Sequence, residues 1–238
     1  MTGVRDTRGT VRARPIPHDL ARSWLLVPAG RLAGVEEADS SAADAVILDL
    51  EDGTPEENKD AARCAAVEWL GAHSAWVRVN ASTTDHWRDD LHALRGQPGL
   101  AGVILAESTT AHDVDRTAAM LGGDAPVVPL IESAAGLHAA EQIAAVPAVA
   151  RLAFGLNDFR RDTGIGASAM ALAYVRSRLV LASHVAGRAP PIDGPAAGAS
   201  GETLVSEVGV TAEMGMTGKL ALHSEQVPII NGHLSPDA

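Results

Sequence analysis

A regular alternation of short apolar runs and longer helix-like segments limits most strongly how this chain of 238 residues can fold. After residue 22, eight runs rich in Val, Ile and Leu each end in polar or glycine residues. In chain order they are SWLLVPAG, ADAVILDLEDG, AWVRVN, AGVILAE, VVPLIES, ARLAFGLND, PPIDGP and KLALHSEQ. Helix-like segments such as KDAARCAAVEWLGAH separate the runs, and EQVPIINGHL supplies the last one. Strands that alternate with helices indicate a parallel sheet covered on both faces.

Eight strand–helix units in a chain of this length predict an α/β fold, a single-domain (β/α)8 TIM barrel. An open doubly wound sheet is the alternative. Its glycine-rich cofactor loop, GxGxxG, is missing after the first strand, where the sequence reads PAGRLAG. We expect residues 1–22 to form an N-terminal tail or arm and residues 23–238 to form the barrel. The seventh strand has the weakest pattern because it lies between prolines.

Net charge, hydropathy and cysteine content limit the partners and the cellular compartment that we expect for this protein. The net charge is −11, which argues against a general nucleic-acid binder. No apolar run approaches the roughly 18 residues of a membrane span, and the N-terminal MTGVRDTRGTVRARPIPHDL lacks the apolar region of a secretory signal. The single cysteine, Cys64, cannot form a disulfide within the chain. We therefore expect a cytoplasmic protein without nucleic-acid or membrane partners.

Polar side chains close the apolar runs, and a barrel places the C-terminal ends of its strands at its active site. The set comprises Asp49, Glu51, Asp52, Arg78, Asn80, Glu107, Glu132, Asn157, Asp158, Asp193 and His223. About two carboxylates plus waters make a hard-oxygen site suited to Mg²⁺. Glu132 and Asp158 end adjacent predicted strands, so their side chains could converge on one ion. The sequence has no Cys/His cluster with zinc spacing.

Spacing alone leaves two interpretations open for Arg78 and two for Glu132. Arg78 lies within an apolar strand, where a charge is costly unless it is paired. It either ties neighbouring strands together through Asp49 or Glu51, or its planar fork grips a substrate carboxylate. Glu132 is either a metal ligand or an acid at the N-cap or first turn of the next helix, where the helix dipole favours it.

Five motifs, in this order, resemble the citrate lyase beta-subunit family, within the malyl-CoA lyase and hydroxy-oxo-acid aldolase superfamily. They are ADAVILDLEDG, VRVN, PLIESAAGL, FGLND and GKLALHSEQV. Each motif lies at the end of a predicted strand. The resemblance runs from about Ser23 to Pro236, which is nearly the whole chain.

The resemblance implies a (β/α)8 barrel, a homo-oligomer that is a trimer or hexamer, and the use of Mg²⁺, with Mn²⁺ as the alternative ion. By this likeness Glu132 and Asp158 would bind the metal. Arg78 and Glu132 would contact the hydroxy-acid or keto-acid end of the substrate. Glu51 and Asp52, in LEDG, would form the acidic turn that shapes the same pocket.

The sequence departs from the family pattern at three places. Ala106 and Glu107 stand where the family usually has Pro-Lys, which replaces a cation by an anion. The late motif, usually Ile-His-Pro-x-Gln, reads LHSEQ here, with Ser224 in place of Pro. Longer CoA-dependent relatives continue into a C-terminal lid with an acidic residue for a neighbouring subunit. Because this chain stops soon after Pro236, we expect that lid to be absent.

The implied activity is that of a carbon–carbon lyase. Retro-aldol cleavage of a 3-hydroxy acid acyl thioester, of the citryl-, citramalyl- or malyl-CoA type, would give a 2-keto acid and an acyl thioester. Arg78 would align the substrate carboxylate, and Glu51 or a metal-bound water would protonate the enolate. A CoA-independent aldolase using pyruvate or another 2-keto acid, and a non-catalytic paralogue, are the alternatives. Arg160 and Arg161 would either meet a CoA phosphate or remain solvated surface charges.

Overall fold

The computed structural model describes residues 16–123 and 125–234. In it, eight parallel strands close into a barrel in which neighbours follow chain order and β1 pairs with β8. The strands are β1 (Ser23–Pro28), β2 (Ala45–Asp49), β3 (Ala75–Val79), β4 (Leu100–Leu105), β5 (Val127–Ile131), β6 (Ala153–Phe154), β7 (Ile192–Asp193) and β8 (Gly218–Ala221). The (β/α)8 barrel predicted from the alternating pattern is confirmed.

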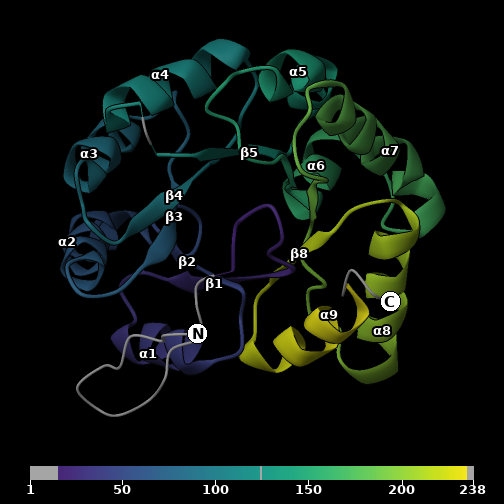
Figure 1. Ribbon diagram of the computed structural model, residues 1–238, viewed down its shortest axis with the longest axis horizontal. Helices are drawn as coiled ribbons and strands as arrows, with labels where there is room; N and C mark the ends of the chain where they lie inside the picture. The colour runs from purple at the N-terminus through teal and green to yellow at the C-terminus, as the bar shows by residue number, and fades with distance from the viewer. Residues whose placement is uncertain (1–15, 124, 235–238) are drawn as a thin grey trace, which may run out of the picture.

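Helices form an outer ring around the strands (Figure 1). They are α1 (Leu32–Ser40), α2 (Lys59–Leu70), α3 (Asp85–Leu94), α4 (Ala111–Leu121), α5 (Ala134–Ala144), α6 (Leu156–Thr163), α7 (Ala169–Val185), α8 (Gly201–Glu213) and α9 (Val227–His233), with short 3₁₀ helices η1 (Glu56–Asn58) and η2 (Ser224–Gln226). Thr84, Thr110, Ser133 and Ser168 cap α3, α4, α5 and α7 by accepting backbone N–H bonds. No helix in the described part of the chain is long and apolar enough to cross a membrane.

Helix α6 is the element that the sequence did not predict. The motif FGLND was assigned to the end of the sixth strand, but β6 has only two residues and α6 begins directly after Gly155. The helix ends at Gly164, whose left-handed backbone (φ 72°) suits glycine. Asp158 therefore lies in the first turn of a helix rather than on a strand. It remains at the C-terminal end of the barrel, where the dipole of α6 favours an acid.

The barrel interior is a packed apolar core. Inward-facing side chains fill it: Trp24, Ile47, Trp76, Ile104, Val128, Leu130, Ala153, Ile192 and Leu220. The rings of Trp24 and Trp76 meet edge to face, with centroids 5.0 Å apart. Alternate residues such as Leu48 and Val77 pack outward under the helices. The interior of the barrel is thus apolar between its two ends.

Arg151 closes the N-terminal end of the barrel. Its side chain is fully buried, and burial lowers the pKa of this guanidinium to about 10. It donates, over 2.7–3.3 Å, to the carbonyl oxygens of His18, Ala21, Pro190 and Pro191 and to the hydroxyl of Thr217. These bonds hold the segment 16–22 against the barrel. The rest of the expected N-terminal tail, residues 1–15, lies outside the described residues.

Candidate active site

A cavity of about 150 Å³ lies at the C-terminal end of the barrel. Five of the polar residues predicted at strand ends line it: Asp52, Arg78, Glu132, Asn157 and Asp158. Apolar side chains, among them Leu26, Leu130 and Leu220, form its floor and walls. The strand-end pattern therefore located the cavity and most of its polar groups.

The other six predicted residues do not line this cavity. Asp49, Glu51 and Glu107 contact residues that do, and the remaining three lie outside it. The carboxylate of Asp193 is fully buried between Arg176 (3.0 Å) and Lys219 (3.2 Å). The amide of Asn80 is held by Asp90 and Lys59, and His223 is exposed at a separate hollow beside β1. The strand-end pattern could not distinguish these residues from those that line the cavity, because both groups lie at the ends of strands.

Glu132 follows β5 directly and is the most buried acid of the cavity, with 6% of the residue exposed. Its Oε1 accepts a hydrogen bond from the backbone N–H of Glu107 at 2.6 Å. Burial raises the pKa of Glu132 to about 8, and the negative charges of Glu51 and Asp158 contribute. The N-cap interpretation of Glu132 is wrong, because the Ser133 hydroxyl caps α5 by accepting from the N–H of Gly136.

The backbone of Glu107 has an unusual conformation that serves this contact. Its φ is +47°, and among the described residues it is the one non-glycine residue with a positive φ. A side chain at such a position is strained, but the conformation directs the N–H group to the carboxylate of Glu132. The Glu107 side chain itself is exposed. The sequence carried no signal for this backbone role.

Glu132 and Asp158 together form a donor set that fits Mg²⁺. Both carboxylates line the cavity, and their mutual repulsion contributes to the raised pKa of Glu132. Asp158 is about one-third exposed and pairs with Arg161 at 2.8 Å. The described residues contain no group of three or more His, Cys, Asp or Glu side chains suited to a metal. Two carboxylates with waters and substrate oxygens are a usual environment for this ion.

Arg78 is tied to both acids that the sequence offered as partners. Its Nε and Nη2 donate to the two carboxylate oxygens of Asp49 at 2.8 and 2.7 Å, and its Nη1 lies 2.9 Å from Glu51. The strand-tying interpretation is therefore confirmed. The guanidinium also lines the cavity, so contact with a substrate carboxylate remains our proposal.

The acidic turn after β2 is built around Asp49. The Asp49 carboxylate accepts the N–H groups of Glu51 (2.9 Å) and Gly53 (2.8 Å). Position 53 requires glycine, because a Cβ there would lie 2.3 Å from Asp49 Oδ2. Burial raises the pKa of Glu51 to about 7, although the charge of Arg78 acts in the opposite direction.

Lys59 stabilises this turn through hydrogen bonds, a role that the sequence did not predict. Its buried Nζ donates to the carbonyl oxygens of Leu50 (2.8 Å) and Glu51 (2.9 Å) and to Oδ1 of Asn80 (2.8 Å). A lysine at the start of an amphipathic helix usually reads as a surface residue. Only the folded structure shows that this one joins α2 to the ends of β2 and β3.

We expect Gly155→Ala to weaken metal binding. An alanine Cβ would lie 2.4 Å from both the Cβ and the Oε2 of Glu132, so the carboxylate must move. Overpacking of this kind costs about 1–3 kcal/mol of stability. Titration calorimetry with Mn²⁺ measures the loss of affinity, and Gly166→Ala is the control, because a Cβ at 166 meets nothing within 4 Å. Equal Mn²⁺ affinity in both variants would show that Glu132 is not a ligand or adapts without cost.

Comparison with known proteins places the chain among enzymes with this architecture. The family model described as HpcH/HpaI aldolase/citrate lyase matches residues 22–224. A citrate lyase subunit beta-like protein of Deinococcus radiodurans is 32% identical, over 92% of this chain and 82% of that protein. A (3S)-malyl-CoA thioesterase of Cereibacter sphaeroides is 30% identical, over 90% of this chain and 77% of that protein.

A solved structure agrees with the sequence comparison. It is that of protein CitE from Mycobacterium tuberculosis in complex with magnesium, acetoacetate and coenzyme A, with a TM-score of 0.79 and 31% identity. The match covers 92% of this chain and 82% of that chain. The barrel fold and the family model therefore agree. This chain belongs to the HpcH/HpaI aldolase/citrate lyase family.

Proposed function

We propose that this protein is a Mg²⁺-dependent carbon–carbon lyase. Its substrate would be a 3-hydroxy acid acyl thioester of the citryl-, citramalyl- or malyl-CoA type, cleaved to a 2-keto acid and an acyl thioester. One observation carries the proposal: the carboxylates of Glu132 and Asp158 face one cavity beside the guanidinium of Arg78. Membership of the lyase family supports it.

The reaction needs one proton removed and one proton delivered. A base takes the proton of the substrate hydroxyl, and the bond from the hydroxyl-bearing carbon to the adjacent methylene breaks. The electron pair passes to the methylene carbon as a thioester enolate, which then takes up a proton. Glu51 is our candidate for these transfers. Its ion pair with Arg78 places it beside the cavity, and a pKa of about 7 lets it exchange protons near neutrality.

Arg78 and the acids position the substrate in this proposal. The guanidinium of Arg78, fixed by Asp49, would hold the substrate carboxylate and align the scissile bond. Asp52, exposed at the rim of the cavity, would contact the substrate from the side of the acidic turn. Mg²⁺ bound by Glu132 and Asp158 would lower the pKa of the substrate alcohol and stabilise negative charge on its oxygen.

A substrate screen tests the proposal directly. Malyl-, citramalyl- and citryl-CoA are incubated with the protein and Mg²⁺, and release of the 2-keto acid is followed. We expect release from at least one of the three, loss of release with a chelator and recovery with added Mg²⁺. No keto acid from any of the three, at protein concentrations that bind Mn²⁺, would overturn the lyase proposal.

Glu107 favours a second candidate, a CoA-independent aldolase that uses a 2-keto acid. The backbone N–H of Glu107 contacts Glu132 and its side chain is exposed. In this candidate function, the exposed carboxylate faces the path of CoA and repels its phosphates. We expect Glu107→Lys to raise kcat/KM for a CoA thioester at low salt, by roughly two- to fivefold, as for exposed charge pairs. Salt should screen the gain, and an uncharged aldehyde acceptor should show none.

A matched control separates local from overall charge in this experiment. Glu68→Lys makes the same change in net charge near the end of α2, at the opposite end of the barrel. Thioester kinetics for both variants are compared at low and high salt. An unchanged kcat/KM in Glu107→Lys would mean that Glu107 does not face the path of CoA, and the CoA-independent candidate would lose its support.

We also propose a homo-oligomer, trimer or hexamer, in the cytoplasm. Helix α7 exposes four large apolar side chains, Met170, Tyr174, Leu181 and Val185, whose spacing places them on one helix face. Contact between copies would remove this stripe from water. The exposed free thiol of Cys64 is compatible with a reducing compartment. Light scattering gives the mass, and a monomer at working concentrations would contradict the oligomer.

A further inference from the structure

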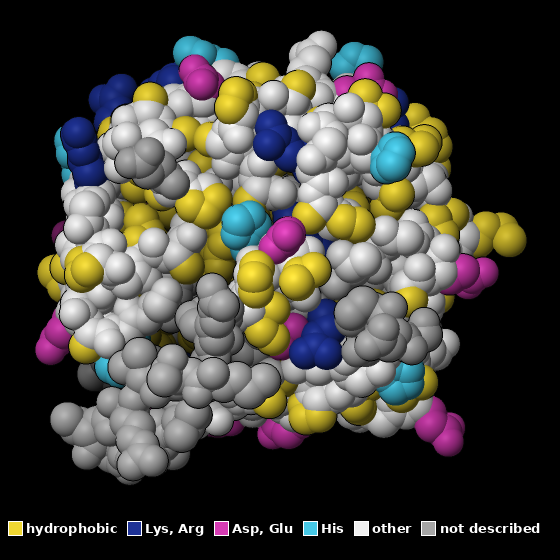
Figure 2. Space-filling view, viewed as in Figure 1, with side chains coloured by type: hydrophobic (Ala, Val, Ile, Leu, Met, Phe, Trp, Pro, Cys, Tyr) yellow, Lys and Arg dark blue, Asp and Glu magenta, His cyan; other side chains and the backbone are white. Residues whose placement is uncertain are grey.

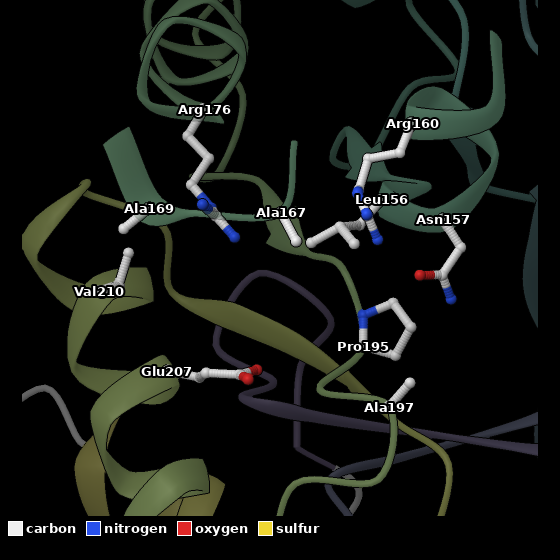
Figure 3. A pocket seen from close by; sticks show the side chains of 10 residues that line it. All are labelled: Leu156, Asn157, Arg160, Ala167, Ala169, Arg176, Pro195, Ala197, Glu207 and Val210. Carbon is white, nitrogen blue, oxygen red and sulfur yellow. The ribbon is translucent and has the colours of Figure 1, made fainter. Parts of the chain in front are cut away.

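A second cavity, of about 220 Å³, lies next to the barrel cavity (Figure 3). It is enclosed by α6, α7, α8 and the loop after β7. Leu156, Asn157 and Pro195 line both cavities. The two cavities therefore meet at these three residues.

Arg176, on α7, is a buried cation in the wall of this second cavity. Only 7% of its side chain is exposed. Within the described residues its guanidinium makes one hydrogen bond, from Nε to Asp193 Oδ1 at 3.0 Å. Its guanidinium group points into the cavity in Figure 3. The two terminal nitrogens are therefore donors that a ligand can use.

Arg160, on α6, is a second cation with unused donors. The structure gives it no hydrogen bond or ion pair among the described residues, and its Nε is buried without a partner. A buried N–H group without an acceptor is costly. The guanidinium of Arg160 points toward the same space as that of Arg176 (Figure 3).

The charges around the second cavity favour a single negative charge. Arg176 and Lys219 share the one carboxylate of Asp193, so this buried cluster keeps one positive charge. Arg160 adds a second positive charge, and Glu207 faces the cavity with one negative charge. The surroundings are thus positive by about one charge in a chain of net charge −11. A carboxylate, with one negative charge, matches this surplus of about one positive charge. A phosphate dianion exceeds it, and Glu207 would repel the dianion more strongly than the carboxylate.

We propose that the second cavity binds a terminal carboxylate of the molecule whose keto-acid end occupies the barrel cavity. The protein would then select a substrate or product with two carboxylates, one at each cavity. This inference rests on the function proposed for the barrel cavity. It assigns the recognition of the distal carboxylate to Arg160 and Arg176, and it assigns rejection of more highly charged groups to Glu207.

Calorimetric titration of matched 2-oxo acids in the presence of Mg²⁺ tests the inference. The pairs are 2-oxoglutarate with 2-oxovalerate and 2-oxoadipate with 2-oxohexanoate, which differ only in the terminal carboxylate. We expect the dicarboxylate of one pair to bind about tenfold more tightly than its partner, as for one charge-assisted hydrogen bond. Arg160→Gln should remove this preference without loss of fold, because Arg160 has no partner in the described structure. Glu207→Gln should increase it.

The control is Arg178→Gln, on the same helix as Arg176 but paired with Glu141 outside the cavity. It should leave the preference unchanged. A dicarboxylate preference that is absent, or that survives Arg160→Gln, overturns the inference while the barrel site stands. Inorganic phosphate that binds through Arg160 without displacing a dicarboxylate also overturns it. Failure of all four acids to bind would instead reject the keto-acid site of the barrel, and the inference with it.

Discussion

Replacement of Glu132 by glutamine is expected to abolish metal-dependent turnover and leave the barrel folded. The amide has the same shape but cannot supply the negative charge of Glu132, one of the two carboxylates that we assign to the metal among those lining the cavity. Changes in groups that only support a metal ligand already cost about 10–100-fold in affinity, so loss of a ligand should cost on the order of 100-fold or more. Calorimetric titration with Mn²⁺ measures this loss independently of any substrate.

The stability of the same variant provides a second test. The pKa of Glu132 is raised from 4.5 to about 8, so the folded state disfavours its ionised form. In the metal-free protein this carboxyl group therefore reduces stability increasingly as pH rises from about 4.5 toward 8. We expect the melting temperature of Glu132→Gln to equal or exceed that of the metal-free wild type, with a difference that grows over this range.

Two comparisons make these results decisive. Asp158→Asn should also lose Mn²⁺ affinity, and Glu141→Gln, which changes an exposed acid on α5, should not. If Glu132→Gln and Asp158→Asn both kept the Mn²⁺ affinity of the wild type, the metal would bind elsewhere. If Glu132→Gln failed to fold, the carboxylate would be a structural group that the barrel itself requires.

Arg78→Lys is expected to lower both stability and catalysis, although it keeps the positive charge. Lysine cannot reproduce the two parallel bonds to Asp49 and the contact with Glu51. Breaking a buried ion pair costs about 3–5 kcal/mol, and the retained charge places this variant near the lower end. For a chain of this size that corresponds to a fall in melting temperature of roughly 6–12 °C.

Asp49→Asn distinguishes the two roles of Arg78. This change weakens the same ion pair but leaves the guanidinium in the cavity wall. If Arg78 only ties strands together, both variants should lose stability and keep the same activity per folded molecule. If Arg78 also holds the substrate carboxylate, Arg78→Lys should show a further loss in kcat/KM of about tenfold or more. Melting curves and kinetics on the same preparations decide between these outcomes.

The fold was predictable because the barrel depends on a repeated local pattern. Apolar runs such as VVPLI form strands covered on both faces, and the polar residue after each run marks the C-terminal end of the barrel. That rule located Glu132 and Arg78 without any knowledge of contacts. For Asp158 the rule predicted the correct end of the barrel but the wrong element, a strand instead of a helix. The two residues of β6 are too few for a sequence pattern to distinguish the strand from the helix that follows.

Other parts of the site depend on contacts that no local pattern encodes. Lys59 reaches Asn80 across 21 residues, and Arg176 meets Asp193 across 17. The positive φ of Glu107 accompanies the bond from its N–H to Glu132, which follows the next strand, and glutamate has no preference for this conformation. The charged second cavity is likewise formed by residues from α6, α7, α8 and the loop after β7, which are distant from one another in the sequence.

On Figure 2, Lys and Arg side chains are scattered among acidic and apolar groups, without a continuous basic patch on that face. The expectation that the protein does not bind nucleic acid stays a prediction. Filter binding at low salt would measure it. A salt-dependent complex with DNA or RNA would contradict it.

Closure by Arg151 has a consequence for synthesis of the protein on the ribosome. Its bonds to His18 and Ala21 span 133 and 130 residues. The second edge of β1 pairs with β8, so this edge stays unpaired until β8 has been synthesised. Until about residue 221 has emerged, β1 and the last strand made both present unpaired edges. Nascent chains stalled before β8 should therefore be sensitive to protease and recruit chaperones. Release of the last strand should convert them in one cooperative step.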